Sequence, residues 1–242
     1  MSTKRTQPAV TGSSSVSPVA SGKTEIDTFL QQARAGINSG TAGGRIILAL
    51  DATMSRQPTW DLACGLQAEM FDAVGKSGKL AVQLTYFRGI SESRASRFVT
   101  DTDALKSLMQ KIHCQGGTTQ IGRILSHALK ETKAQKVQAL VFIGDAMEEN
   151  IDELAATAAA LGLAGTPVFL FQEGRDGAAE VGFKEIARLS RGAWFRFDRS
   201  AASVLAGLLS AVAVYASGGL KALEARGRDG DRLLLQHLGN AR

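Results

Sequence analysis

The apolar positions of this chain form short runs that alternate with amphipathic stretches. Three runs lack the alternation of apolar and polar residues that marks a half-exposed strand, so they predict strands buried on both faces of a sheet. These runs lie at 46–50, 137–144 and 167–171. Further strands are predicted at 80–87, at 193–197 and, as a shorter edge strand after a polar turn, at 95–100.

Apolar residues that recur every three to four positions predict helices between these strands. The helices are expected at 24–37, 58–75, 101–113, 119–133, 151–161, 183–192 and 201–217. Pro58 is suited to a helix start, and Asp101 is suited to an N-cap. Strands that alternate with helices predict an α/β fold, with a doubly wound, mainly parallel sheet flanked by helices.

The chain is expected to consist of one domain with appendages. Residues 1–22 are rich in Ser, Thr, Val and Gly and predict a disordered leader, because they lack the apolar surface that offsets the entropy cost of ordering. Residues 23–43 predict a short helix and a linker, and residues 44–216 predict the α/β domain. Residues 217–242 form the predicted C-terminal tail, whose amphipathic stretch 233–238 is suited to docking on the domain or on a partner.

The strand at 46–50 ends at Asp51, and hydroxyl side chains follow at alternate positions, Thr53 and Ser55. Open α/β sheets bind ligands beyond the carboxyl ends of their strands. Hard cations such as Mg²⁺ take carboxylate and other oxygen ligands, and water fills the remaining positions. Asp, Ser and Thr are also ordinary turn residues, so this stretch by itself favours a plain turn over a metal site.

Two later stretches add matching oxygens. The glycine turn Q-G-G-T-T-Q-I-G, at 115–122, carries hydroxyls into a predicted helix start, and the strand at 137–144 ends at Asp145. Together the three stretches resemble the metal-ion-dependent adhesion site (MIDAS) of the von Willebrand factor A (VWA) domain family. That pattern is D-x-S-x-S followed by a distant Thr and a distant Asp, and the family's T-x-x-G helix start fits Thr119 and Gly122 better than Thr118.

This resemblance implies the roles of the site residues. Thr53, which stands where the family has Ser, and Ser55 are implied as direct metal ligands, with Thr119 as a switchable ligand. Asp51 and Asp145 are implied to act mainly through water. Thr118 and Glu148 are candidates for a supporting layer around these ligands.

The resemblance, to the bacterial intracellular type of VWA domain, also implies a function. The domain would hold Mg²⁺ or Mn²⁺ and leave one coordination position open for an Asp or Glu of a partner protein. Proteins of this kind often work beside chaperones or AAA+ ATPases, so such a partner in the cytoplasm is expected. Catalysis is not expected.

Two alternatives remain beside this interpretation. One is a Mg²⁺-dependent, phosphatase-like hydrolase with Asp51 as the nucleophile. Such enzymes need a second acid two residues later, where this chain has Thr53, and the chain contains no phosphate-loop or nucleophile-elbow motif. The other alternative is a scaffold with a vestigial metal site, against which the complete set of oxygens argues.

The net charge of +5 belongs to the ends of the chain. Residues 1–23 carry three bases and no acid, and residues 217–242 carry five bases and three acids, so the domain between them is neutral. No basic face for specific nucleic-acid binding is therefore predicted.

The remaining composition points to a protein without a membrane span in a reducing compartment. Lys4 and Arg5 are not followed by the apolar run of a secretory signal. The uncharged stretch 201–220 has too few large aliphatic residues for a typical spanning helix. Cys64 and Cys114 give neither a disulfide framework nor metal-ligand spacing.

Overall fold

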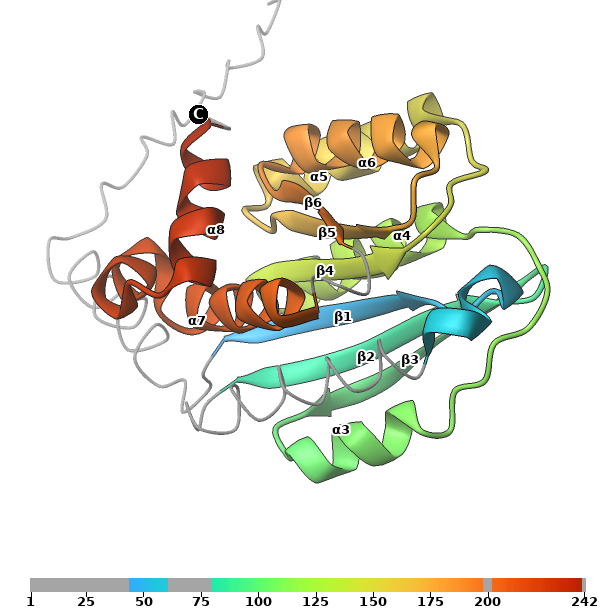
Figure 1. The fold of residues 1–242 in the computed structure, drawn as a ribbon, viewed down its shortest axis with the longest axis horizontal. Coiled ribbons are helices and arrows are strands. Elements are labelled where there is room, and N and C mark those ends of the chain that lie inside the picture. Colours follow the sequence, from blue (N-terminus) through green and yellow to red (C-terminus); the bar gives the residue numbers. More distant parts are fainter. Residues whose placement is uncertain (1–43, 61–79, 198–201, 241–242) are drawn as a thin grey trace, which may run out of the picture. The chain divides into compact units, whose positions relative to one another are not determined.

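Six strands form one sheet in the order β3-β2-β1-β4-β5-β6 (Figure 1). The computed structural model describes residues 44–60, 80–197 and 202–240. Neighbouring strands run parallel except for β3, which is antiparallel to β2 at one edge. This sheet confirms the predicted doubly wound, mainly parallel architecture. The strands are β1 (Arg45–Asp51), β2 (Ala81–Arg88), β3 (Glu92–Val99), β4 (Ala139–Gly144), β5 (Val168–Glu173) and β6 (Ala193–Phe197).

Helices cover both faces of the sheet and bury two hydrophobic clusters. One cluster joins the sheet to α3, α7 and α8, and the other joins it to α4, α5 and α6. Alternate residues of β1 face opposite clusters, Ile46 and Leu48 on one side and Ile47 on the other, so this central strand is apolar throughout. The described helices are the 3₁₀ helix η1 (Met54–Thr59), α3 (Thr102–Met109), α4 (Ile121–Ala134), α5 (Ile151–Leu163), α6 (Gly177–Ser190), α7 (Ala202–Arg226) and α8 (Asp229–Asn240).

The helix starts follow their capping residues. Asp101, the predicted N-cap of α3, accepts hydrogen bonds from the backbone N–H groups of Asp103 and Ala104, at 2.9 and 3.4 Å. Asn150 caps α5 in the same way, and Asp176 caps α6. The cap at Asp176 starts α6 six residues before the predicted helix at 183–192. The predicted helix at 24–37, and the predicted helix at 58–75 from residue 61 onward, lie outside the described residues.

Further predicted boundaries are wrong, two of them beside the candidate site, and helix α3 ends at Met109 rather than at residue 113. The edge strand β3 begins at Glu92 rather than at residue 95, because Gly89 takes a positive φ of 61° in a tight turn after β2 and Arg88 pairs directly with Glu92. Helix α4 begins at Ile121 rather than at Thr119, with Gln120 as its N-cap residue. Thr119 therefore lies in the loop before the helix, which leaves its backbone free of helical constraints.

The segment after residue 216 is folded onto the sheet and is not an appendage. Helix α7 continues through a break at Gly219 (φ 68°, ψ −163°), and α8 packs back against α7 and β6. Leu223 and Leu234 are fully buried in the same cluster as β1. The stretch predicted to dock on the domain or on a partner therefore docks on the domain.

Among the described residues, one helical segment, Ala206–Arg226, is long enough and apolar enough to cross a membrane, judged by length and composition alone. Leu208, Leu209 and Val212 of this stretch are buried in the core beside the sheet. A packed core helix passes the same test, so the absence of a membrane span stays a prediction.

Candidate metal centre

Asp51 is the last residue of β1 and its carboxylate is completely buried. One carboxylate oxygen, Oδ1, accepts the backbone N–H of Thr53 at 2.8 Å. The other, Oδ2, has no hydrogen-bond partner. Burial raises the pKa of Asp51 to about 6, and the nearby charge of Asp145 raises it further, while hydrogen bonds from Thr53 act in the opposite direction. A buried carboxylate with a bare oxygen is an incomplete arrangement that a cation would complete.

Asp145 follows β4, the neighbour of β1 in the sheet. Leu50 pairs with Ile143, so the two carboxylates leave the sheet at adjacent strand ends. The Oδ1 atom of Asp145 is also buried without a hydrogen-bond partner. The structure therefore brings together two carboxylates that repel each other, and one buried oxygen of each has no hydrogen-bond donor.

Thr53 and Ser55 follow Asp51 in the turn that leads into η1. Their hydroxyl oxygens lie 3.0 Å apart, so one hydroxyl donates to the other. Thr53 is almost fully buried, whereas Ser55 is exposed. Ser55 lies in the 3₁₀ helix, whose tight turn brings the two alternate hydroxyls to the same side of the chain.

The loop that carries Thr119 runs beside the loop of Asp51. Gln115 forms a parallel bridge with Thr53, and its backbone N–H donates to Ala52 O at 3.0 Å. Gly117 is required here, because a Cβ atom at this position would lie 2.0 Å from the carbonyl oxygen of Gly89. This close contact between the glycine turn and the β2–β3 turn holds the Thr119 loop against the site.

Thr119 is 7% exposed and is held by the loop between β4 and α5. Its backbone N–H donates to Glu148 Oε2 at 3.0 Å, and its hydroxyl oxygen accepts the backbone N–H of Glu148 at 2.9 Å. The hydroxyl donates to the carboxylate of Glu149, whose other oxygen accepts the backbone N–H of Gly122 at 3.2 Å. Glu148, predicted as a supporting residue, therefore contacts Thr119. Thr118 is exposed, and its backbone N–H is directed at Gly89 O.

Glu149 and Arg56 are the two residues that the sequence did not single out. Glu149 lies near the start of α5, and it fixes both Thr119 and the first turn of α4. Arg56 is completely buried directly after Ser55, and its Nε lies 3.0 Å from Glu173 Oε2 at the end of β5. It also donates to Ile143 O at 3.1 Å, so it joins the Asp51 loop to β4 and β5.

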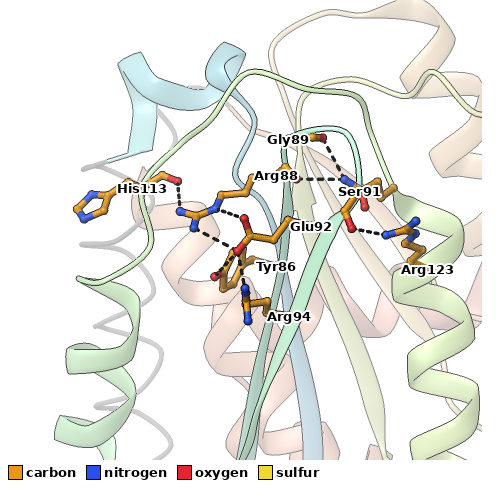
Figure 2. Close-up of polar contacts among 9 residues, drawn as sticks. Tyr86, Arg88, Gly89, Ser91, Glu92, Arg94, His113 and Arg123 are labelled. Carbon is orange, nitrogen blue, oxygen red and sulfur yellow. Dashed lines mark hydrogen bonds and ion pairs between the residues drawn. The ribbon is translucent and has the colours of Figure 1, made fainter.

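A second polar cluster, at the end of β2, supports the same edge of the sheet (Figure 2). Arg88 pairs with Glu92 at 2.9 Å and donates to the carbonyl oxygen of His113 at 3.0 Å. Hydrogen bonds from Arg88, and then from Arg94, lower the pKa of the Glu92 carboxyl. His113, predicted at a helix end, lies beyond the end of α3, so this cluster fastens the chain that leads to the glycine turn.

The donor set fits a divalent cation. Two bare carboxylate oxygens, of Asp51 and Asp145, require positive charge, and the hydroxyls of Thr53 and Ser55 supply neutral oxygens beside them. The hydroxyl of Thr119 donates its only proton to Glu149, so its remaining lone pair is available as an acceptor.

No family model and no curated protein matches the sequence, but solved structures match the fold. The chain is similar to a von Willebrand factor type A protein from Catenulispora acidiphila, with a TM-score of 0.60 and 16% identity over 73% of this chain and 43% of that chain. It is similar to the SpRpn10 VWA domain, with a TM-score of 0.56 and 13% identity over 69% of this chain and 95% of that chain.

A third similar structure is proximal thread matrix protein 1 from the mussel byssus, with a zinc-occupied MIDAS motif. The TM-score is 0.58 and the identity 18%, over 71% of this chain and 48% of that chain. The chain thus spans less than half the length of the Catenulispora and mussel chains. At identities this low, the structural similarity shows the fold alone. This fold is the one that the sequence resemblance predicted.

Proposed function

We propose, from the von Willebrand factor A fold of this chain, that it is a metal-dependent protein-interaction module. Asp51, Thr53, Ser55, Thr119 and Asp145 would hold a divalent cation, Mg²⁺ or Mn²⁺, at the carboxyl ends of β1 and β4. The observation that carries this proposal is the pair of buried carboxylate oxygens, one on each Asp, without a hydrogen-bond partner.

The bound cation would supply two positive charges and an open coordination position for a carboxylate of a partner protein. The kinds of ligand that this chain supplies would make that position suitable for a carboxylate. Three of the five proposed ligands are neutral hydroxyls, so the two carboxylates balance the cation's charge without surrounding it with anions. An Asp or Glu of a partner would then complete the coordination favourably. A cytoplasmic chaperone or AAA+ ATPase remains the expected kind of partner.

The position of Asp51 favours the binding module over the hydrolase. A nucleophilic carboxylate must reach a substrate in its ionised form. The Asp51 side chain is completely buried, so it is not presented to a substrate. Thr53, two residues on, cannot act as the acid and base that such a hydrolase needs.

Metal binding is tested by thermal unfolding with EDTA, MgCl₂ or MnCl₂. Ligand at a hundred times its Kd stabilises a folded protein by about 2.7 kcal/mol, so saturating metal should raise the Tm of the parent chain. The Asp51→Ala, Asp145→Ala double variant should lose this rise. A double variant that responds to metal as the parent does would place the metal elsewhere and overturn the proposal.

A further inference from the structure

A cavity of about 770 Å³ opens at the edge of the sheet opposite the candidate metal centre. It lies between the C-terminal ends of α5 and α6 on one side and α7 and α8 on the other (Figure 1). Its walls are largely apolar, and none of its lining residues belongs to the proposed metal centre. The apolar lining residues are Pro167, Tyr215, Leu220, Leu235 and Leu238.

Leu163, the last residue of α5, is 83% exposed beside this cavity. Gly162 and Gly165, which flank it in the sequence, both line the cavity. A Cβ atom on Gly162 would lie 2.5 Å from a carbonyl oxygen of α6, so the end of α5 packs directly against the end of α6. Lys136 donates to Ala164 O and Gly165 O at 2.6 and 2.5 Å, which holds the turn after Leu163. The chain therefore presents a large apolar side chain on a fixed turn, next to an apolar hollow.

Two charges of opposite sign stand at the rim of the same cavity. Arg191 and Glu224 both line it, and both are exposed. Within the described part of the chain, neither side chain makes an ion pair or a hydrogen bond. Arg191 ends α6 with a φ of 59°, in the left-handed region that glycine usually occupies at this position. The chain thus places a guanidinium at the rim where glycine would terminate the helix with less strain.

We infer that this face binds a second copy of the chain around a two-fold axis. In such an interface the same surface is used twice, so each copy must offer both a protruding group and the hollow that receives it. Leu163 of each copy would enter the cavity of the other, and Arg191 of each copy would pair with Glu224 of the other.

The rim charges favour a second copy over other occupants. A ligand of one charge would leave either Arg191 or Glu224 unmatched, and a wholly apolar ligand would leave both unmatched, whereas a two-fold axis matches each charge with its opposite. The metal centres, at the other edge of each sheet, would remain open in the dimer. Two linked centres would bind a partner that offers two acidic segments more tightly than one centre does.

Sedimentation equilibrium of the full chain, in EDTA and low salt, should show a monomer–dimer equilibrium that depends on protein concentration. Leu163→Ala should raise the dimer Kd about tenfold or more, because each dimer loses two buried leucine side chains. The matched control is Val181→Ala, which truncates an apolar side chain of α6 that is 68% exposed and does not line the cavity. It should leave the dimer Kd unchanged.

Charge reversal tests the pairing across the axis. Arg191→Glu and Glu224→Arg should each raise the dimer Kd roughly three- to tenfold, because each places like charges together twice in the dimer. The variant with both substitutions restores opposite charges across the axis, so its Kd should return close to that of the parent. The effect of each single reversal should also shrink at high salt.

A chain that stays monomeric at the highest concentration reached would overturn the inference. A dimer that is unaffected by Leu163→Ala, or single reversals that are not rescued when they are combined, would overturn it as well. Because these measurements are made in EDTA, they do not depend on the proposed metal-dependent function, and either idea can fail while the other stands.

Discussion

The hydroxyl of Thr119 donates a hydrogen bond to the carboxylate of Glu149, and its oxygen accepts the backbone N–H of Glu148. A hydroxyl has one proton and two acceptor lone pairs. Both contacts come from the loop after β4, so they fix the rotation of the hydroxyl and leave one lone pair for a cation. Residues far from Thr119 in sequence thus orient the hydroxyl that is proposed as a metal ligand.

Replacing Glu149 should therefore weaken metal binding. Glu149→Ala removes the acceptor for Thr119 and for the backbone N–H of Gly122. Loss of a group that orients a metal ligand typically costs 10- to 100-fold in affinity, and loss of a cap costs about 1 kcal/mol of stability. Metal titration calorimetry and urea unfolding measure the two effects. Asp152→Ala is the matched control, and unchanged metal affinity in Glu149→Ala would contradict the role.

Thr119→Ala should keep the fold but lose metal-dependent capture of an Asp-containing peptide. The substitution removes little volume and leaves the glycine turn unchanged, but the cation loses a neutral oxygen. Thr119→Ser restores the oxygen and should largely restore capture. Capture is scored with Mg²⁺ and with EDTA, and capture that survives both EDTA and Thr119→Ala would exclude a metal bridge.

The stability of the metal-free protein should fall as pH rises through the titration range of Asp51. Its pKa is raised from 3.8 to about 6, chiefly by burial, so the folded state holds a proton that the unfolded state releases. Between about pH 4 and pH 6 the folded state therefore loses about 2 to 3 kcal/mol relative to the unfolded state, and it does not regain this at higher pH.

Asp51→Asn should remove this loss, because Asn stays neutral and can still accept the Thr53 N–H. Urea unfolding in EDTA at pH 4.5 and pH 7.5 measures the free energy of unfolding of both proteins. The stability of the variant relative to the parent should be greater at pH 7.5 than at pH 4.5. A stability difference between parent and variant that is the same at both pH values would contradict the raised pKa.

The sequence predicted the parts of the site that depend on local pattern. An apolar run that ends in Asp places a carboxylate at a strand end, and parallel pairing of β1 and β4 then brings Asp51 and Asp145 to one edge. Arg56 and Glu149 escaped prediction because their roles depend on contacts across the fold. A charged residue in a polar loop is usually solvated, and nothing near Arg56 in sequence indicates that Glu173 would meet it in the core.

The end of α7 and helix α8 were missed for a different reason. The break at Gly219 and the charged residues after it interrupt the apolar pattern, so 217–242 reads as a tail. Leu223 and Leu234 are buried only because α8 folds back on α7, and the ion pair of Arg226 with the buried Asp231 holds that connection. The break shifts the spacing of the apolar residues on its two sides, so a sequence window that spans it detects no helical period.

Leu234→Ala should consequently destabilise the whole domain. The side chain is fully buried in the cluster shared with β1, and truncation of a buried Leu costs about 2 to 5 kcal/mol. Leu233, its exposed neighbour on α8, provides the control, and Leu233→Ala should cost less than about 0.5 kcal/mol. Equal, small effects in urea unfolding would show that α8 does not belong to the cooperative core.

The buried ion pair of Arg56 and Glu173 should stabilise the domain, and the contributions of the two residues should depend on each other. Arg56→Met removes the cation but leaves the Glu173 carboxylate at the end of β5, and breaking a buried pair in this way typically costs about 3 to 5 kcal/mol. The Arg56→Met, Glu173→Gln double variant removes the stranded charge and should lose clearly less than the sum of the single variants. Urea unfolding in EDTA measures this cycle, and strictly additive losses would contradict the pairing.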